Sequence, residues 1–291
     1  MKFVQYRDIA LFRQRVDDFL LREEVLNNII IGITTRLMNG EQAGELFLGY
    51  VEDDASEVVA TTMSTALRGS VLLSQISNTD AIAHLVSAYA KANKSLSSVE
   101  GSPEDSTQFA ERWQEYSGQS FYTFMELGFY RLDSVIAPKN VSGYARPANN
   151  NDFNMLVDWL IQFSSDTGMN KNYSREIAEN NIRRKLDYPI LGGIRIWMDD
   201  NQPVSMAAAT RETPNGGNIS LVYTPDSFRG HGYASAITAT VSQAILNTGK
   251  QFCFLTTDLA NPTSNKIYKS IGYKHIGNQR RIDFEQSSGE A

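Results

Sequence analysis

The sequence ISLVYTPDSFRGHGYA fills residues 219–234 and predicts a strand, a loop and the first turn of a helix. The apolar run Ile219–Tyr223 is typical of a buried strand. Gly230 and Gly232 carry no side chain, so the backbone amides of the loop can approach an anion closely. The helix that follows offers free N–H groups and the positive end of its dipole, and Arg229 can add a charge-assisted hydrogen bond. The stretch therefore predicts a phosphate-binding loop, although a plain tight turn would need the same glycines.

Two familiar nucleotide-binding motifs fit this loop poorly. A P-loop is excluded because no Lys-Ser or Lys-Thr pair follows the second glycine. A dinucleotide fingerprint would run from Gly230 to Ser235, with serine in place of the third glycine and Asp258 as the ribose acid. That fingerprint belongs to a leading βαβ unit. Here the preceding strands are joined by a hairpin at Asp200-Asn201, so they are expected to be antiparallel.

A second motif lies at residues 261–273, which read NPTSNKIYKSIGY. Asn261 is suited to cap a helix that begins at Pro262, and Gly272 is suited to end it. Asn261, Asn265 and Tyr268 recur at spacings of four and three, which places them on or near one helix face. Taken alone, this pattern is typical of a capped core helix in which Tyr268 only packs.

Together the two motifs resemble those of the GNAT acetyltransferase superfamily, over residues 143–284. Its cofactor loop has the form Arg/Gln-x-x-Gly-x-Gly/Ala, and a later helix carries Asn-x-x-x-x-x-x-Tyr-x-x-x-Gly-Phe/Tyr. The matching residues are Arg229, Gly232 and Ala234 in the loop and Asn261, Tyr268, Gly272 and Tyr273 in the helix. The resemblance implies direct transfer of acetyl from acetyl-CoA, as co-substrate, to a primary amine.

The resemblance also implies roles for individual residues. A backbone N–H of the strand at Leu221–Tyr223 would stabilise the oxyanion, and Tyr268 would be the catalytic residue that protonates the departing thiolate. The implied cofactor-binding residues are Leu221, Val222, Tyr223, Arg229, Gly230, His231, Gly232, Tyr233, Ala234, Asn261, Ser264 and Tyr268. Glu212 is a candidate base, with a solvated turn as its plainer explanation.

The two halves of the chain share an order of elements: two helices, three strands, a helix and a strand. In the first half the third strand, at 70–74, leads into a helix without an Arg-Gly-x-Gly loop. Residues 97–103 are expected to form a turn, and 121–127 and 129–132 two separate strands. A break at Ala137-Pro138-Lys139-Asn140 predicts domains 1–138, a degenerate GNAT-like domain, and 139–291, the acetyl-CoA-binding domain. The predicted fold class is α/β (α+β): two GNAT-like domains, each with a mixed, mostly antiparallel sheet flanked by helices.

Composition excludes several classes of function. Residues 1–141 carry 12 Lys and Arg against 19 Asp and Glu, so no nucleic-acid partner is expected there. No apolar run reaches the roughly 18 residues of a membrane span, and the start does not resemble a signal peptide. Cys253 is the single cysteine, and His84, His231 and His275 are scattered, so no metal site is expected.

The combined expectation is a cytoplasmic enzyme, a monomer or homodimer, that uses a small-molecule or peptide amine as acceptor. Two rivals stay open at this stage. One is a catalytically silent acyl-CoA-binding sensor or interaction module, since no base is evident. The other is a nicotinamide-dependent oxidoreductase, for which the loop would have to serve as a dinucleotide fingerprint.

Overall fold

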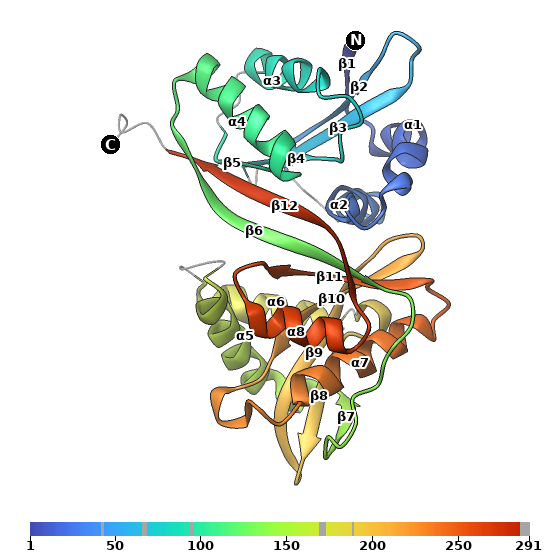
Figure 1. Ribbon diagram of the computed structural model, residues 1–291, viewed down its shortest axis with the longest axis vertical. Coiled ribbons are helices and arrows are strands. Elements are labelled where there is room, and N and C mark those ends of the chain that lie inside the picture. Colours follow the sequence, from blue (N-terminus) through green and yellow to red (C-terminus); the bar gives the residue numbers. More distant parts are fainter. Residues whose placement is uncertain (42–43, 66–68, 93–95, 169–172, 188, 286–291) are drawn as a thin grey trace. The chain divides into compact units, whose positions relative to one another are not determined.

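The chain runs twice through the order strand, two helices, three strands, helix, strand, helix, strand (Figure 1). The computed structural model describes residues 1–285 apart from 42–43, 66–68, 93–95, 169–172 and 188. The first pass comprises β1 (Lys2–Tyr6), α1 (Ile9–Arg22), α2 (Asn28–Met38), β2 (Leu46–Glu52), β3 (Val58–Thr65), β4 (Ser70–Leu73), α3 (Ala81–Lys91), β5 (Ser98–Gly101), α4 (Pro103–Ser117) and β6 (Phe121–Leu132). The second comprises β7 (Tyr144–Pro147), α5 (Phe153–Thr167), α6 (Arg175–Asp187), β8 (Ile194–Asp199), β9 (Gln202–Glu212), β10 (Gly216–Tyr223), α7 (Tyr233–Leu246), β11 (Phe252–Asp258), α8 (Pro262–Ser270) and β12 (Lys274–Phe284). Short 3-10 turns lie at Asn150–Asp152, Ile190–Gly192 and Asp226–Phe228.

The described chain forms two compact units with the same internal pairing. In unit 1, β1 to β4 are antiparallel neighbours and β4 pairs with β5 in parallel. In unit 2, β7 to β10 are antiparallel neighbours and β10 pairs with β11 in parallel. Each sheet is therefore mixed and mostly antiparallel, which confirms the predicted fold class.

The last strand of each pass contributes residues to the unit built by the other pass. Unit 1 includes the chain up to Phe129 and takes up β12 from Gly277 onward, where Arg280–Asp283 pair antiparallel with Ser98–Gly101 of β5. Unit 2 begins at Tyr130, so it includes the last three residues of β6. The units therefore differ from the expected domains 1–138 and 139–291, which are contiguous in sequence. Strands as long as β6 and β12 can begin in one core and end in another.

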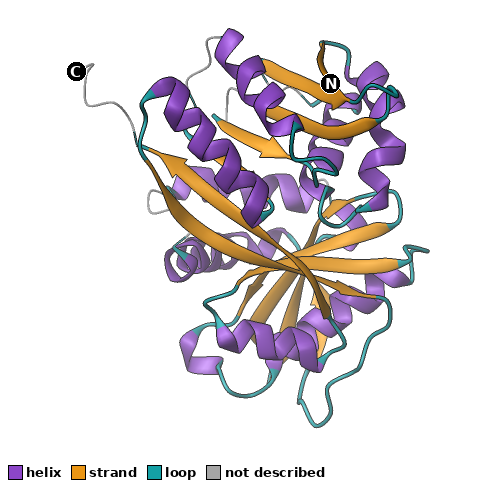
Figure 2. Cartoon of the chain, turned by 45° about the horizontal axis from the view of Figure 1, so that its top comes forward, coloured by secondary structure: helices purple, strands orange, loops and turns teal. Residues whose placement is uncertain are grey.

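Both faces of the unit 2 sheet are covered by helices (Figure 2). Ala207 and Ala209 of β9 belong to the core beneath α7 and α8, whereas Met206 and Ala208 belong to the core beneath α5 and α6. Because successive side chains of a strand point to opposite faces, this alternation separates the two cores. Tyr130 and Leu132 of β6 are buried in the core beneath α7.

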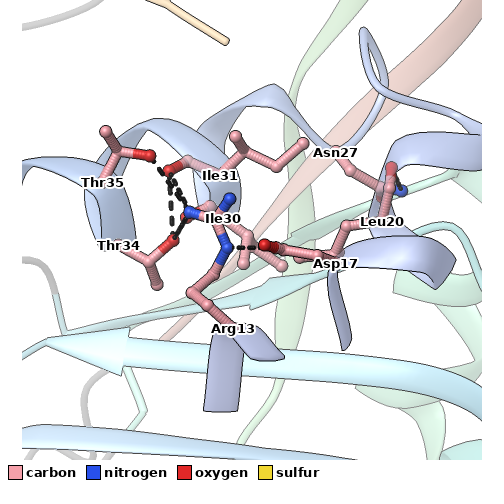
Figure 3. Close-up of polar contacts among 8 residues, drawn as sticks. All are labelled: Arg13, Asp17, Leu20, Asn27, Ile30, Ile31, Thr34 and Thr35. Carbon is pink, nitrogen blue, oxygen red and sulfur yellow. Dashed lines mark hydrogen bonds and ion pairs between the residues drawn. The ribbon is translucent and has the colours of Figure 1, made fainter. Parts of the chain in front are cut away.

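In unit 1 the helices α1 and α2 are joined by a buried cation (Figure 3). Arg13 of α1 is only 7% exposed and pairs with Asp17 one turn later. Its guanidinium donates to the Thr34 and Thr35 hydroxyls of α2 at 2.9 and 3.0 Å. A buried charge is tolerated when such partners satisfy it, so Arg13 fixes the packing of the two helices.

The structure corrects several sequence-based expectations about the strands. The predicted turn at 97–103 contains β5, and the two strands expected at 121–127 and 129–132 are one strand, β6. The strand β1 was not expected at all. Pairing with neighbouring strands decides these cases, since Ser98 and Glu100 of β5 are polar but buried between β4 and β12. Over the described residues, no helix is long and apolar enough to cross a membrane.

Candidate functional site

The strand β10 carries a bulge at the residues expected to stabilise an oxyanion. Ser220 lies opposite Ala208 of β9, and Tyr223 lies opposite Met206. Leu221 and Val222 therefore both lie opposite Ala207, the residue between these two. Leu221 adopts a left-handed backbone with φ of 54°, which is rare for a branched side chain. A bulge takes backbone groups out of the regular ladder. The backbone here is therefore shaped to offer N–H groups to something other than β9.

The pairing of β10 with β11 ends just before this bulge. The parallel register joins Gly216–Asn218 to Phe252–Phe254 and extends no further among the described residues. At the paired end the strands approach closely, because a side chain on Gly216 would begin 2.2 Å from the Phe252 ring. The bulge thus lies on the stretch of β10 that does not pair with β11.

The loop after β10 brings two left-handed glycines to the start of α7. Gly230 and Gly232 have φ values of 85° and 83°, a conformation that strongly favours glycine. Gly232 is the N-cap residue of α7. Because glycine has no side chain, it does not cap the first helical N–H groups. Those N–H groups and the helix dipole suit an anion. A Cβ at Gly230 would meet open space, whereas one at Gly232 would lie 3.0 Å from Val141.

Arg229 is held by groups of unit 2 itself. Its guanidinium contacts the carboxylates of Asp166, at the end of α5, and of Asp226, both at 2.8 Å. Its Nε donates to the Thr224 carbonyl at 3.0 Å. These contacts tie the loop to α5. The role expected from the sequence, a hydrogen bond from Arg229 to a phosphate, stays a prediction.

His231 at the end of the loop and Tyr233 at the start of α7 are the next two side chains. The His231 ring stacks on Tyr233, with centroids 5.5 Å apart. The Tyr233 hydroxyl donates to Asp199, which also accepts from the Ser142 hydroxyl at 2.9 Å. The hydrogen bond from Tyr233, more than any other contact, lowers the pKa of Asp199. These contacts anchor the first turn of α7, while Ala234 follows within the helix.

The helix α8 forms as its motif predicts. Asn261 caps it by accepting the Ser264 N–H at 3.0 Å, and Pro262 is its first residue. Tyr268 is 8% exposed, and burial raises the pKa of its hydroxyl. Within the described part of the chain, this hydroxyl has no hydrogen-bond partner. Tyr268 therefore stays protonated at neutral pH and has a proton available to donate.

The sequence did not single out a set of polar side chains next to the bulge. The Thr210 hydroxyl donates to Asn218 at 2.8 Å and lies 3.0 Å from the Ser220 hydroxyl. Asn218 is only 4% exposed. The sequence did contain a signal for this set, because Asn218 and Ser220 alternate with apolar residues in β10. Glu212, the candidate base, instead forms an ion pair with Lys250 at 3.2 Å. Across the described residues, no cluster of histidine, cysteine or acidic side chains could hold a metal ion.

Solved structures identify the class of fold. A GCN5-related N-acetyltransferase from Sphaerobacter thermophilus matches with a TM-score of 0.64 and 14% identity, covering 97% of this chain and 95% of that one. A GNAT-family acetyltransferase from Colwellia psychrerythraea has a TM-score of 0.57 and 11% identity, with coverage of 98% and 99%. A tandem GNAT protein from the clavulanic acid biosynthesis pathway has a TM-score of 0.58 and 12% identity, with coverage of 100% and 99%.

The chain has the fold of the GNAT N-acetyltransferases along its whole length. The model of the FR47-like protein family matches residues 199–282, which include the bulge, the glycine loop and α8. No curated protein matches this chain.

Proposed function

We propose that unit 2 transfers the acetyl group of acetyl-CoA to a primary amine by direct attack. The observation that carries this proposal is the bulge at Leu221–Val222, on the stretch of β10 that β11 leaves unpaired. The left-handed glycines and the uncapped start of α7 follow directly in the chain. One segment thus combines donors for a carbonyl oxygen with donors for a pyrophosphate.

Each of these groups has a distinct task in the proposed reaction. Acetyl-CoA supplies the acetyl group as a thioester. The bulge amides of β10 bind its carbonyl oxygen and become stronger partners as negative charge develops there. The amine must lose a proton to attack, which water can accept if no side chain does. Tyr268 donates its proton to the sulfur as the carbon–sulfur bond breaks. The nitrogen then loses its surplus proton, which restores the tyrosine hydroxyl, so the products are an amide and the free thiol of CoA.

The runner-up is an acyl-CoA-binding sensor that performs no chemistry. The ion pair of Glu212 with Lys250 favours it, because the candidate base is already engaged. The acceptor, a small molecule or a peptide amine, and the state of the chain, monomer or homodimer, stay predictions.

The first test measures cofactor binding with a matched pair of substitutions at Gly230. Asparagine and aspartate both tolerate a left-handed backbone, and the position faces open space. Gly230→Asp adds a negative charge beside the proposed pyrophosphate, whereas Gly230→Asn adds the same volume without charge. We expect calorimetry to show that Gly230→Asp binds acetyl-CoA about tenfold more weakly than Gly230→Asn. Equal affinities of the two folded variants for acetyl-CoA would show that the pyrophosphate does not bind at this loop.

The second test measures chemistry. Wild-type protein is incubated with acetyl-CoA and a panel of primary amines, and release of the CoA thiol is followed. Thiol release that depends on an amine supports the transferase. Binding of acetyl-CoA without turnover on any amine in the panel would favour the sensor instead.

A further inference from the structure

Unit 1 retains a bulge that matches the one in unit 2 residue by residue. Ser74 of unit 1 donates its N–H to the Thr61 carbonyl at 3.0 Å, and Ser77 donates to the Val59 carbonyl at 2.9 Å. Gln75 and Ile76 therefore both lie opposite Ala60 of β3. In unit 2, Leu221 and Val222 lie in the same way opposite Ala207. The two halves thus place the same pair of backbone amides at the end of the fourth strand of their repeat, within β10 in unit 2 and just after β4 in unit 1.

In unit 1, however, the chain's own side chains satisfy both of these amides. The Gln75 N–H donates to Asn27 Oδ1 at 2.8 Å. Burial raises the pKa of the Asp105 carboxyl, and its interaction with the Ile76 N–H opposes that rise. Both acceptors are buried, Asn27 at 3% and Asp105 at 5% exposure. Two side-chain oxygens therefore stand where an acyl oxygen would have to bind.

Further contacts hold each of these side chains in place. Asn27 lies in the turn between α1 and α2, and its Nδ2 donates to the Leu20 carbonyl at 2.9 Å (Figure 3). Asp105, in the first turn of α4, accepts the Ser102 hydroxyl at 2.7 Å. Moving either side chain aside would leave buried polar groups without partners, which is unfavourable.

The matching positions of unit 2 carry shorter side chains. Ser102 and Asn261 are the N-cap residues of α4 and α8, so Asp105 corresponds to Ser264. Ser174, immediately before α6, corresponds to Asn27 and caps its own helix by accepting the Ile177 N–H at 3.2 Å.

Two other parts of the proposed site are changed in unit 1. Seven residues after the N-cap, Phe109 stands in α4 where α8 has Tyr268, so unit 1 lacks the hydroxyl at this position. The residue before α3 is Asp80, whereas the residue before α7 is Gly232. A carboxylate there would repel a pyrophosphate.

We propose that Asn27 and Asp105 close the acyl site of unit 1 from within, by occupying the two bulge amides that in unit 2 receive the acyl oxygen. Unit 1 then binds no acyl-CoA. The contacts of Asn27 and Asp105 with the bulge instead connect the α1–α2 turn and α4 to the end of β4. The comparison rests on the proposed function of unit 2, but the closure of unit 1 can be measured independently.

Amide hydrogen exchange of the full-length protein, resolved at residues 75–76 and 221–222, tests this closure. Without ligand, the amides of Gln75 and Ile76 should exchange slowly, and saturating acetyl-CoA should leave their rates unchanged. The amides at 221–222 should slow when acetyl-CoA is added. Fast exchange at 75–76 without ligand, or slowing there on addition of acetyl-CoA, would overturn the closure. Slow exchange at 75–76 with no response at 221–222 would leave the closure intact and count against the proposed function.

Substitutions separate a specific hydrogen bond from general burial. Asn27→Ala should speed exchange at Gln75 roughly tenfold or more, because it removes the acceptor. The Ser74 amide, bonded to Thr61, is the internal control, since global destabilisation would speed both amides together. Asp105→Ala should act in the same way on Ile76, and Asp105→Asn, which keeps an acceptor oxygen, should not. Unchanged exchange at Gln75 in folded Asn27→Ala would refute the assignment, and the wild-type measurement decides the matter if that variant does not fold.

Discussion

The Tyr268 hydroxyl is the residue-scale feature that bears most directly on chemistry. Tyr268→Phe removes one oxygen that has no hydrogen-bond partner in the described part of the chain, so stability and acetyl-CoA affinity should hardly change. Turnover should fall roughly 10²-fold, the usual contribution of a general acid. Tyr273→Phe is the matched control, because the Tyr273 hydroxyl is bonded to Ser242 at 2.9 Å and should matter for folding alone. Near-wild-type single-turnover rates for Tyr268→Phe would assign its ring to packing.

Arg229 provides a second test at this scale. Since its guanidinium is held by Asp166 and Asp226, we expect it to act by anchoring the loop to α5. Arg229→Gln and Asp166→Asn should then weaken acetyl-CoA binding to a similar extent, by less than about tenfold each, as is usual for exposed ion pairs. The double variant should be no weaker than the worse single one. A loss confined to Arg229→Gln would instead make Arg229 a phosphate ligand.

Single residues were predictable where the local sequence decides their role. The glycines of the loop, the Asn261 cap and the buried Tyr268 follow from motifs in which backbone conformation or helix position is fixed by neighbours. One partner of Arg229 could not be predicted, because Asp166 is distant in sequence and its approach depends on how α5 packs. The same holds for Asn27, whose importance appears only when β4 is placed beside it.

At the scale of elements, the start of α5 depends on one ion pair. Arg146 of β7 donates two hydrogen bonds of 2.7 Å to Asp152, which lowers the pKa of that carboxyl. Because the folded pKa lies below the unfolded value near 3.9, the stabilisation is complete well above pH 4 and is lost as pH falls through the folded pKa. Asp152→Asn should therefore lower the free energy of unfolding at pH 7, by roughly 1–3 kcal/mol.

Urea titrations of wild type and Asp152→Asn at several pH values check this expectation. The difference between the two proteins should be constant from pH 8 to about pH 5 and should shrink below pH 4. A difference that does not change with pH would mean that the carboxylate contributes packing rather than charge. Asp158→Asn is a suitable control, since Asp158 of α5 forms an exposed pair with Arg175, the first residue of α6.

Helices and hairpins were recognised from the sequence more readily than the strands between them. The caps and apolar spacing of α7 and α8 are local signals. By contrast, β5 reads Ser-Val-Glu-Gly and has no local strand signal; it is a strand because β4 and β12 pair with its two edges. The bulges after β4 and in β10 are invisible in the sequence for the same reason, since a register is a property of two strands.

At the scale of the whole molecule, β12 completes the sheet of unit 1. Ile282 pairs with Val99 of β5 and is 1% exposed in the core beneath α3 and α4. Ile282→Ala should lower the free energy of unfolding by roughly 2–5 kcal/mol, the usual cost of a cavity. Ile276→Ala, on the same strand but 40% exposed, should cost less than about 1 kcal/mol. Denaturant unfolding of both variants checks the pair, and equal costs would mean that β12 contributes little to this core.

The exchange of final strands has a consequence for how the protein is made. A ribosome proceeds from β1 toward β12, so the edge of β5 has no partner until residues 280–283 have been synthesised. An unpaired edge attracts other strands, and nascent chains are prone to association for this reason. A chaperone that shields β5 during translation would suit this architecture. A premature stop codon shortly before residue 280 would, by the same logic, damage the part of the protein that was translated first.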